Sequence, residues 1–237
     1  MQNAHFLANS TYSIYARHFH TKGIARAADQ VAIFLSNDIV FGAIIGSIIY
    51  LEALIVFVIN GRPLISPSGQ IKLWEGDIQS PENSQHIFDW YTFTHILHGF
   101  IFYAIGSGTA YIFPSADIGV RGFYIMALLL EALWETIENS PPAISRHRET
   151  AANGYHGDSV LNSVSDMLAI SFGYWLAYLL PPLAVLGLAL VEEIFNAIAI
   201  RDNLTLSVVQ LVHPSESISR WQAQGGITQR PFTQDTD

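Results

Sequence analysis

The stretch GFYIMALLLEALWETIENSPP, residues 122–142, decides how this chain is expected to fold. Residues 122–130 are apolar enough to lie inside a bilayer, and the run then ends in Glu131, Glu135, Glu138 and Asn139. Residues three and four positions apart share one face of an α-helix, so these polar groups are expected to line one side of a membrane helix. An ionised side chain in mid-membrane costs about 2.5–3.5 kcal/mol on insertion scales, so its placement is informative.

The composition of the 237-residue chain favours a membrane protein. Half of the residues are apolar and 13% are charged, whereas soluble globular domains contain about a quarter charged residues. The formal net charge is −9, and no basic stripe is present to neutralise phosphates, so no nucleic-acid partner is expected. The chain has no cysteine, which excludes disulfides, thiolate catalysis and cysteine-ligated metals.

Five apolar segments are long enough to cross a bilayer, which requires about 20 residues each. They are residues 39–60, 90–113, 122–138, 160–180 and 183–200. Only helices and closed barrels satisfy their backbone groups in lipid, and these runs are too long and continuous for barrel strands. The sequence therefore predicts an all-α fold, a polytopic membrane bundle of about five transmembrane helices spanning residues 39–200.

The remaining residues are expected to lie outside the membrane. Residues 1–38 are predicted to form an N-terminal extramembrane segment, and residues 201–237 an amphipathic C-terminal segment followed by a disordered tail. The predicted surroundings are a lipid bilayer. The Lys and Arg distribution does not fix the orientation, and partnership with another membrane protein or with a second copy of the chain stays open.

Two further segments carry polar residues at helical spacing. His95 and His98 lie near the start of the second segment, while Asp158, Asn162 and Asp166 surround the start of the fourth. Because consecutive spans run in opposite directions, these starts and the ends of the third and fifth spans share one side of the membrane. We therefore expect a single polar cluster near one membrane face, with Arg201 beside it.

Imidazole nitrogen and carboxylate oxygen are natural ligands for zinc, manganese and non-haem iron, so a divalent metal is one candidate cofactor. Its candidate ligands are His95, His98, Glu135 and Asp158. The residues expected to bind a non-metal ligand are Glu131, Glu138, Asn139, Asp158, Asn162 and Arg201, so Asp158 is a candidate for both roles.

Several functions fit such a cluster. The site could bind a ligand or an ion, or its polar groups could only tie the helices together, at about 0.6–2 kcal/mol per interaction. It could instead form a membrane-embedded enzyme acting on a lipid head group or envelope precursor by acid–base or metal-assisted chemistry. The catalytic candidates are then His95, His98, Glu135 and Asp166. A proton or ion pathway is a further alternative, and whether the chain is an enzyme stays open.

Four motifs together resemble an uncharacterised family of bacterial multi-pass inner-membrane proteins. They are ENSQHIFDWYTFTHILHGFIFY from residue 82, EALWETIENSP from residue 131, YHGDSVLNSVSDMLA from residue 155 and IRDNLTL from residue 200. The resemblance implies an integral membrane protein and no particular activity. The order of a His helix, a Glu helix and an Asp/Asn helix is also similar to that of the VanZ-like membrane proteins, a likeness of fold that carries no function.

Overall fold

The computed structural model describes residues 38–116, 118–150 and 155–229. These residues form eight α-helices and one short 3₁₀ helix, and no strand occurs among them apart from an isolated bridge between Trp74 and Phe88. The predicted all-α fold is therefore confirmed for the described part of the chain. The predicted N-terminal segment, except for its last residue, and the end of the C-terminal tail lie outside the described residues.

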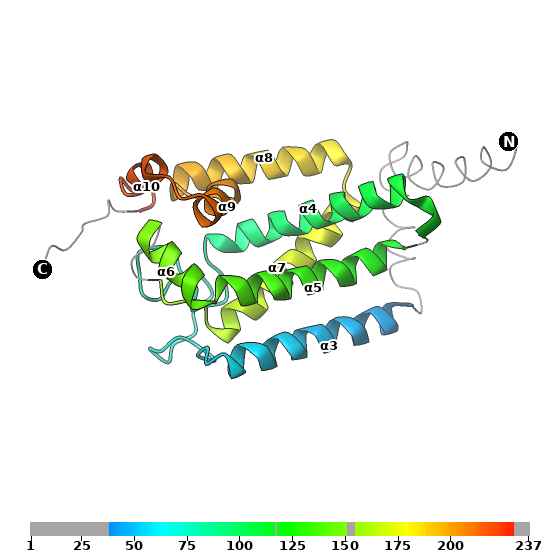
Figure 1. Ribbon diagram of the computed structural model, residues 1–237, viewed down its shortest axis with the longest axis horizontal. Helices are drawn as coiled ribbons and strands as arrows, with labels where there is room; N and C mark the ends of the chain where they lie inside the picture. The colour runs from blue at the N-terminus through cyan, green and yellow to red at the C-terminus, as the bar shows by residue number, and fades with distance from the viewer. Residues whose placement is uncertain (1–37, 117, 151–154, 230–237) are drawn as a thin grey trace, which may run out of the picture.

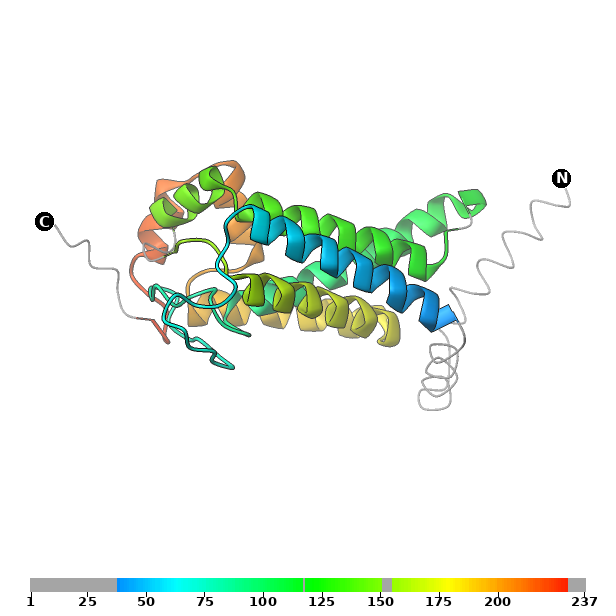
Figure 2. The ribbon, with the colours of Figure 1, turned by 90° about the horizontal axis from the view of Figure 1, so that it is seen from below.

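Five long helices run lengthwise beside one another and make up the body of the protein (Figure 1, Figure 2). They are α3 (Asp38–Ile59), α4 (Tyr91–Ile112), α5 (Val120–Glu138), α7 (Val160–Leu179) and α8 (Pro182–Ala199). The chain breaks between α7 and α8 at Pro181–Pro182, where proline is tolerated because the first helical residues need no hydrogen-bond donor. By length and composition, α8 is the one helix among the described residues that is apolar enough to cross a membrane. The five-span topology therefore stays a prediction.

A close crossing of α4 and α7 holds the centre of the bundle together. A Cβ atom on Gly99 would collide with the backbone of Ile170 and Tyr174, and one on Gly173 would collide with the backbone of Ile96. Only glycine lets the two backbones approach this closely. Because Gly99 directly follows His98 in α4, the crossing also fixes the depth at which the histidines face α5 and α7.

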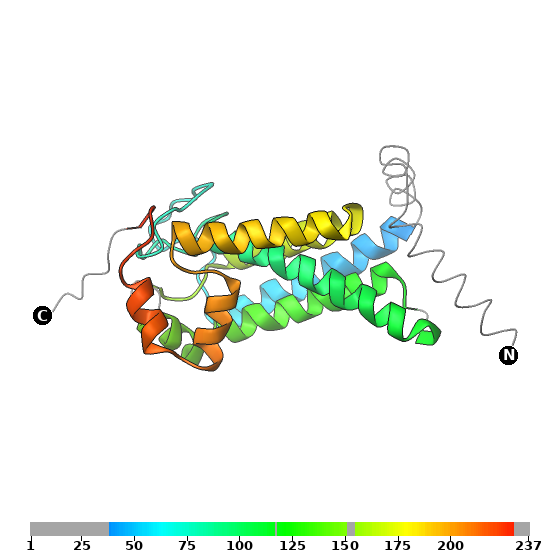
Figure 3. The ribbon, with the colours of Figure 1, turned by 90° about the horizontal axis from the view of Figure 1, so that it is seen from above.

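The short helices gather at one end of the bundle. They are α6 (Pro141–Thr150), α9 (Leu204–Val212) and α10 (Glu216–Gln222), and they lie with the connection between α3 and α4 at the same end (Figure 1, Figure 3). The opposite end carries the turn between α4 and α5, which contains the 3₁₀ helix η1 (Pro114–Ala116). The starts of α4 and α7 and the ends of α5 and α8 therefore meet beneath the short helices.

Candidate functional site

The polar residues of three helices converge at this end of the bundle. His95 and His98 come from α4, Glu131 and Glu135 from α5, and Asp166 from α7, and each is less than 10% exposed. A second group, formed by Asn139, Asp158 and Asn162, is buried as well. Glu138, also predicted for the site, is half-buried. Most of the predicted site residues are thus brought together.

Glu131 lies between the two histidines. Its Oε1 atom is 2.6 Å from Nδ1 of His95, and its Oε2 atom is 3.0 Å from Nδ1 of His98. An ionised carboxylate only accepts hydrogen bonds, so both rings donate to it through Nδ1–H. The Nε2 atom of a neutral His95 is consequently left with its lone pair available, and it faces Oδ2 of Asp166 at 3.9 Å.

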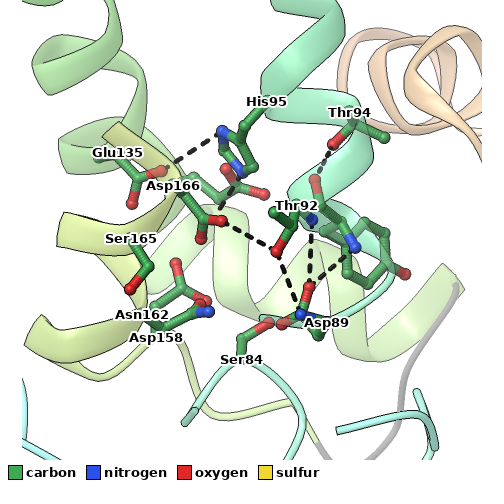
Figure 4. A network of polar contacts seen from close by, with 12 residues as sticks. Ser84, Asp89, Thr92, Thr94, His95, Glu135, Asp158, Asn162, Ser165 and Asp166 are labelled. Atoms are coloured by element: carbon green, nitrogen blue, oxygen red, sulfur yellow. Dashed lines mark hydrogen bonds and ion pairs between the residues drawn. The ribbon is translucent and has the colours of Figure 1, made fainter. Parts of the chain in front are cut away.

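Glu135 differs from Glu131 in having no hydrogen-bond partner. Its side chain is fully buried, and neither carboxylate oxygen forms a hydrogen bond. The nearest cation candidate is Nδ1 of His95 at 3.7 Å from Oε1, beyond hydrogen-bond range. Figure 4 shows Glu135 directed toward His95, with Asp166 beside it. A buried polar group without a partner is unusual and calls for an explanation such as an ion or a ligand.

Asp158 and Asn139 form the opposite kind of contact, a closed pair between the end of α5 and the start of α7. The Asn139 amide donates to Oδ2 of Asp158 at 2.6 Å, and the backbone N–H of Asp158 donates back to Oδ1 of Asn139 at 2.6 Å. The Tyr155 hydroxyl donates to Oδ1 of Asp158 at 3.0 Å. Burial raises the pKa of Asp158 above its ordinary value, although the hydrogen bonds from Asn139 and Tyr155 act in the other direction.

The connection between α3 and α4 is fastened to this closed pair. Arg62 donates to the backbone oxygen of Asp158 at 2.8 Å, and the Asn162 amide donates to the backbone oxygen of His86 at 3.0 Å. Ser159 caps α7 by accepting from the backbone N–H of Asn162 at 3.1 Å. The loop thereby closes the end of the bundle over the polar residues.

A small cavity lies between these groups. Its volume is about 20 Å³, and its lining includes His95, Glu138, Asp158 and Asp166 as well as Tyr91 and His147. A single buried water needs about 10–15 Å³. The cavity therefore has room for one ion or water molecule, surrounded by an imidazole and carboxylates.

The structure groups the candidate metal ligands differently from the sequence-based prediction. Donor atoms lie within 4.8 Å of one another in two sets among the described residues, His95–His98–Glu131 and His95–Glu135–Glu138. Asp158, predicted as a ligand, has both of its carboxylate oxygens engaged by Asn139 and Tyr155. Helical spacing defines the polar face of each helix, but it does not determine which residues of different helices meet at one depth.

Arg201 points into the C-terminal segment instead of the cavity. Its guanidinium donates to the backbone oxygen of Trp221 at 2.9 Å and lies 5.3 Å from the centre of that ring. Arg201 has a φ angle of 57° at the turn that follows α8. The next residue, Asp202, takes the buried position, where its carboxylate accepts from Tyr91 at 3.1 Å.

Sequence reasoning did not single out Asp89, Tyr155 or His147. Asp89 Oδ1 accepts from the backbone N–H groups of Tyr91 and Thr92, while Thr92 Oγ1 accepts from the Asp89 N–H (Figure 4). This reciprocal pattern at the start of α4 resembles a capping box, so an Asp three residues before Thr was a detectable signal. Tyr155 and His147 reach the cavity from a loop and from α6, and local spacing gives no signal for them.

Comparison with known proteins places the chain in a family. Residues 57–224 match the family model described as "Protein of unknown function (DUF2585)". The chain is 47% identical over 176 residues to a UPF0314 protein of Sphingopyxis alaskensis, covering 74% of this chain and 90% of the relative. It is 42% identical over 180 residues to a UPF0314 protein of Novosphingobium aromaticivorans, covering 74% and 89%. No solved structure matches.

All of the clustered polar residues fall inside the matched range. The expected membership of an uncharacterised family is thus confirmed, whereas the membrane setting and the VanZ-like similarity stay predictions. From the length of the match and the identity to its relatives, this chain belongs to the DUF2585 family.

Proposed function

We propose that the chain is a multi-pass inner-membrane protein that binds an ion among the buried histidine and carboxylate side chains at one end of its helical bundle. The observation that carries the binding function is Glu135, a fully buried carboxylate with neither oxygen hydrogen-bonded. Leaving such a group without a partner costs about 1–3 kcal/mol or more. A residue whose only role was to hold helices together would form hydrogen bonds with its neighbours.

The outer surface of the bundle supports the membrane setting. The five long helices contain 18 to 22 residues, a length of about 27–33 Å at 1.5 Å per residue, close to the roughly 30 Å hydrocarbon core of a bilayer. Large apolar side chains face outward along α8, where no other helix of the described residues covers them. The exposed residues include Leu183, Leu186, Leu190, Val191, Ile194 and Ile198. An apolar surface of this extent is typical of a membrane or partner interface.

The contrast between the inside and the outside of α5 supports the same setting. Glu131 and Glu135 are buried, while Met126, Leu129 and Leu133 on the same helix are exposed. A surface helix of a water-soluble protein buries its apolar side chains and exposes its charged ones. A bilayer accounts for the arrangement on α5, because lipid solvates the apolar side chains that face outward from this helix.

The size of the cavity favours ion binding over the enzymatic alternative. A volume of about 20 Å³ holds one ion, whereas ligand pockets for drug-sized molecules measure about 300–1,000 Å³. A lipid head group or envelope precursor would need a much larger opening at the end of the bundle. Acid–base chemistry by His95 and Asp166 is therefore the less supported function.

Three measurements test the proposal. Alkaline carbonate extraction of cell membranes is expected to leave the protein in the pellet, and reporter fusions in the successive loops are expected to alternate in compartment. Thermal unfolding of the detergent-purified protein is then measured with a panel of small ions, for the wild type, Glu135→Gln and Glu52→Gln. Glu52 is an exposed carboxylate on α3 and serves as the matched control.

The expected result is that at least one ion stabilises the wild type and Glu52→Gln but not Glu135→Gln. A ligand at about 100 times its Kd adds about 2.7 kcal/mol to the free energy of unfolding. Release of the protein by carbonate would contradict the membrane setting. Equal responses of all three proteins to every ion would contradict the binding function and leave a purely structural cluster.

A further inference from the structure

We propose that His95, Glu135, Glu138 and Asp166 hold one divalent transition-metal ion, and that Glu131 orients His95 toward it. This inference rests on the proposed ion-binding function and names the class of ion. The argument begins with the imidazole of His95, because the two sides of this ring have different surroundings (Figure 4).

One side of the His95 ring is fixed by protein. Nδ1 lies 2.6 Å from Oε1 of Glu131, a short distance that is typical of a charge-assisted hydrogen bond. Metal-binding histidines almost always donate their second ring nitrogen to a carboxylate or carbonyl in this way, which sets the tautomer and raises the basicity of the other nitrogen. Glu131 thus leaves Nε2 as the atom of His95 that is free to bind a cation.

The other side of the ring faces the carboxylate of Asp166 at a distance too long for a hydrogen bond. Nε2 lies 3.9 Å from Oδ2 of Asp166. Two ligands bound tetrahedrally to one ion at about 2.1 Å lie roughly 3.4 Å apart. The separation is therefore nearer to that of two ligands of a common ion than to that of a hydrogen-bonded pair, and a shift of a few tenths of an ångström would close the difference.

Glu135 and Glu138 complete the set from α5. Each offers an oxygen that lies within 4.8 Å of a nitrogen of His95 and of the other glutamate's oxygen. Glu138 lines the cavity together with His95 and Asp166. Glu135 supplies an observation independent of the cluster itself, since it is fully buried and both of its oxygens lack a hydrogen-bond partner. A bound cation would give those oxygens a partner.

His98 belongs to the support of this site and is not assigned as a ligand. Its ring lies 5.4 Å from the ring of Trp134 and 6.0 Å from that of Phe102. Its Nδ1 donates to Glu131 at 3.0 Å, so it holds the carboxylate that in turn holds His95.

The donor set selects the class of ion. One imidazole nitrogen and several carboxylate oxygens suit zinc, manganese or ferrous iron, while calcium and magnesium prefer oxygen ligands alone. The cavity of about 20 Å³ admits a single ion. The charge of the ion would also offset the carboxylates that otherwise crowd one small, dehydrated space.

The test measures metal content and affinity in the full-length, detergent-purified protein carrying no polyhistidine tag. The protein is stripped with a chelator and loaded separately with zinc, manganese and ferrous iron, and metal is measured by mass spectrometry. The wild type and the Glu52→Gln control are expected to take up one equivalent of at least one of these ions. Glu135→Gln and Asp166→Asn are expected to bind it at least about ten-fold more weakly.

The role of Glu131 requires a separate readout. Glu131→Gln is expected to keep the one-to-one stoichiometry at saturating metal, to weaken affinity about 10–100-fold, and to change the visible absorption of a bound cobalt(II) probe. A structural role alone would leave that spectrum unchanged. If Asp166→Asn fails to give a monodisperse protein, Glu135→Gln still decides the matter, because Glu135 makes no hydrogen bond whose loss would unfold the bundle.

The inference is overturned if the loaded wild type holds well under one equivalent of every ion, or if both ligand variants bind as tightly as the wild type. Its failure is distinguishable from failure of the proposed function. Stabilisation of the wild type, but not of Glu135→Gln, by a monovalent or alkaline-earth ion would refute the transition-metal assignment and retain ion binding. Absence of any selective stabilisation would refute both.

Discussion

The polar end of the bundle contains two layers that differ in how their hydrogen bonds are made. The closed layer, formed by Asn139, Asp158 and Tyr155, pairs both side-chain oxygens of Asp158 and both ends of the Asn139 amide. The open layer, formed by His95, Glu135 and Asp166, contains a carboxylate with no partner and ion pairs of 3.7 and 3.9 Å. The layers share a helix, α5, and are equally buried.

The difference separates stability from function. Buried polar groups with satisfied hydrogen bonds specify how α5, α7 and the loop fit together, and their removal is expected to weaken the fold. Buried groups without partners lower stability, so their presence indicates a role other than folding.

The largest effect is expected in the closed layer. Asn139→Ala removes the amide that donates to Asp158 at 2.6 Å and accepts from its backbone N–H. Loss of both bonds at a buried carboxyl is expected to lower the free energy of unfolding by about 3 kcal/mol. Denaturation of the detergent-purified wild type and variant measures this change in the free energy of unfolding. Thr136→Ala, which removes a bond within α5 alone, is the control, and a similar loss in both variants would contradict the closed layer.

A smaller, pH-dependent effect is expected at Asp202, a buried carboxylate outside both layers whose oxygens accept hydrogen bonds, as those of Asp158 do. Burial raises its pKa from 3.8 to about 6, although hydrogen bonds from Asn203, Tyr91 and Ser207 oppose the change. The folded protein therefore retains this proton more strongly than the unfolded chain. Stability should fall as the pH rises from about 4 to about 6, by about 2 kcal/mol from this residue.

The comparison of wild type with Asp202→Asn isolates this contribution from the other titrating groups. The variant cannot ionise at residue 202, so its stability should vary less over the same pH range. The measurement is the difference between the two stability curves against pH. Parallel curves would show that the hydrogen bonds to Asp202 compensate fully for its burial.

In the open layer, Glu135→Gln is expected to leave the stability of the metal-free protein unchanged or to raise it by up to about 1 kcal/mol. The substitution removes a group whose charge is unfavourable in a buried site and breaks no hydrogen bond. The free energy of unfolding of the chelator-treated Glu135→Gln variant is measured and compared with that of Asn139→Ala. A loss as large as that of Asn139→Ala would assign Glu135 to the closed layer.

The gathering of the polar residues at one end of the bundle could be anticipated from the sequence. Helical spacing defined the inward faces of three helices. On α4 this face carries His95 and His98, on α5 it carries Glu131 and Glu135, and on α7 it carries the Asp and Asn residues. The reversal of direction between consecutive helices placed those faces at the same end. The first inference depends on helical geometry and the second on the alternating direction of consecutive helices, and both features are present in the structure.

The pairing within the cluster could not be anticipated. Spacing does not fix the rotation and depth of one helix against another, and here the contact of Gly99 and Gly173 with the opposing backbones sets both. Glu131 therefore meets the histidines, while Glu135 is left without a hydrogen bond. The contributions of Tyr155 and His147 depend on a loop and on α6, whose positions follow from tertiary contacts.

The smallest effect is expected at Arg201, a predicted site residue that lies in neither layer. Its guanidinium contacts Gln224 and Trp221 near an exposed surface, where a cation–π contact contributes about 0.5–1 kcal/mol. Arg201→Ala should therefore lower stability by less than about 1 kcal/mol and leave metal affinity unchanged. Metal titration and denaturation of this variant check both outcomes. A marked change in metal affinity would mean that the turn after α8, through Asp202 and Tyr91, positions the open layer, and the separation of the two layers would then fail.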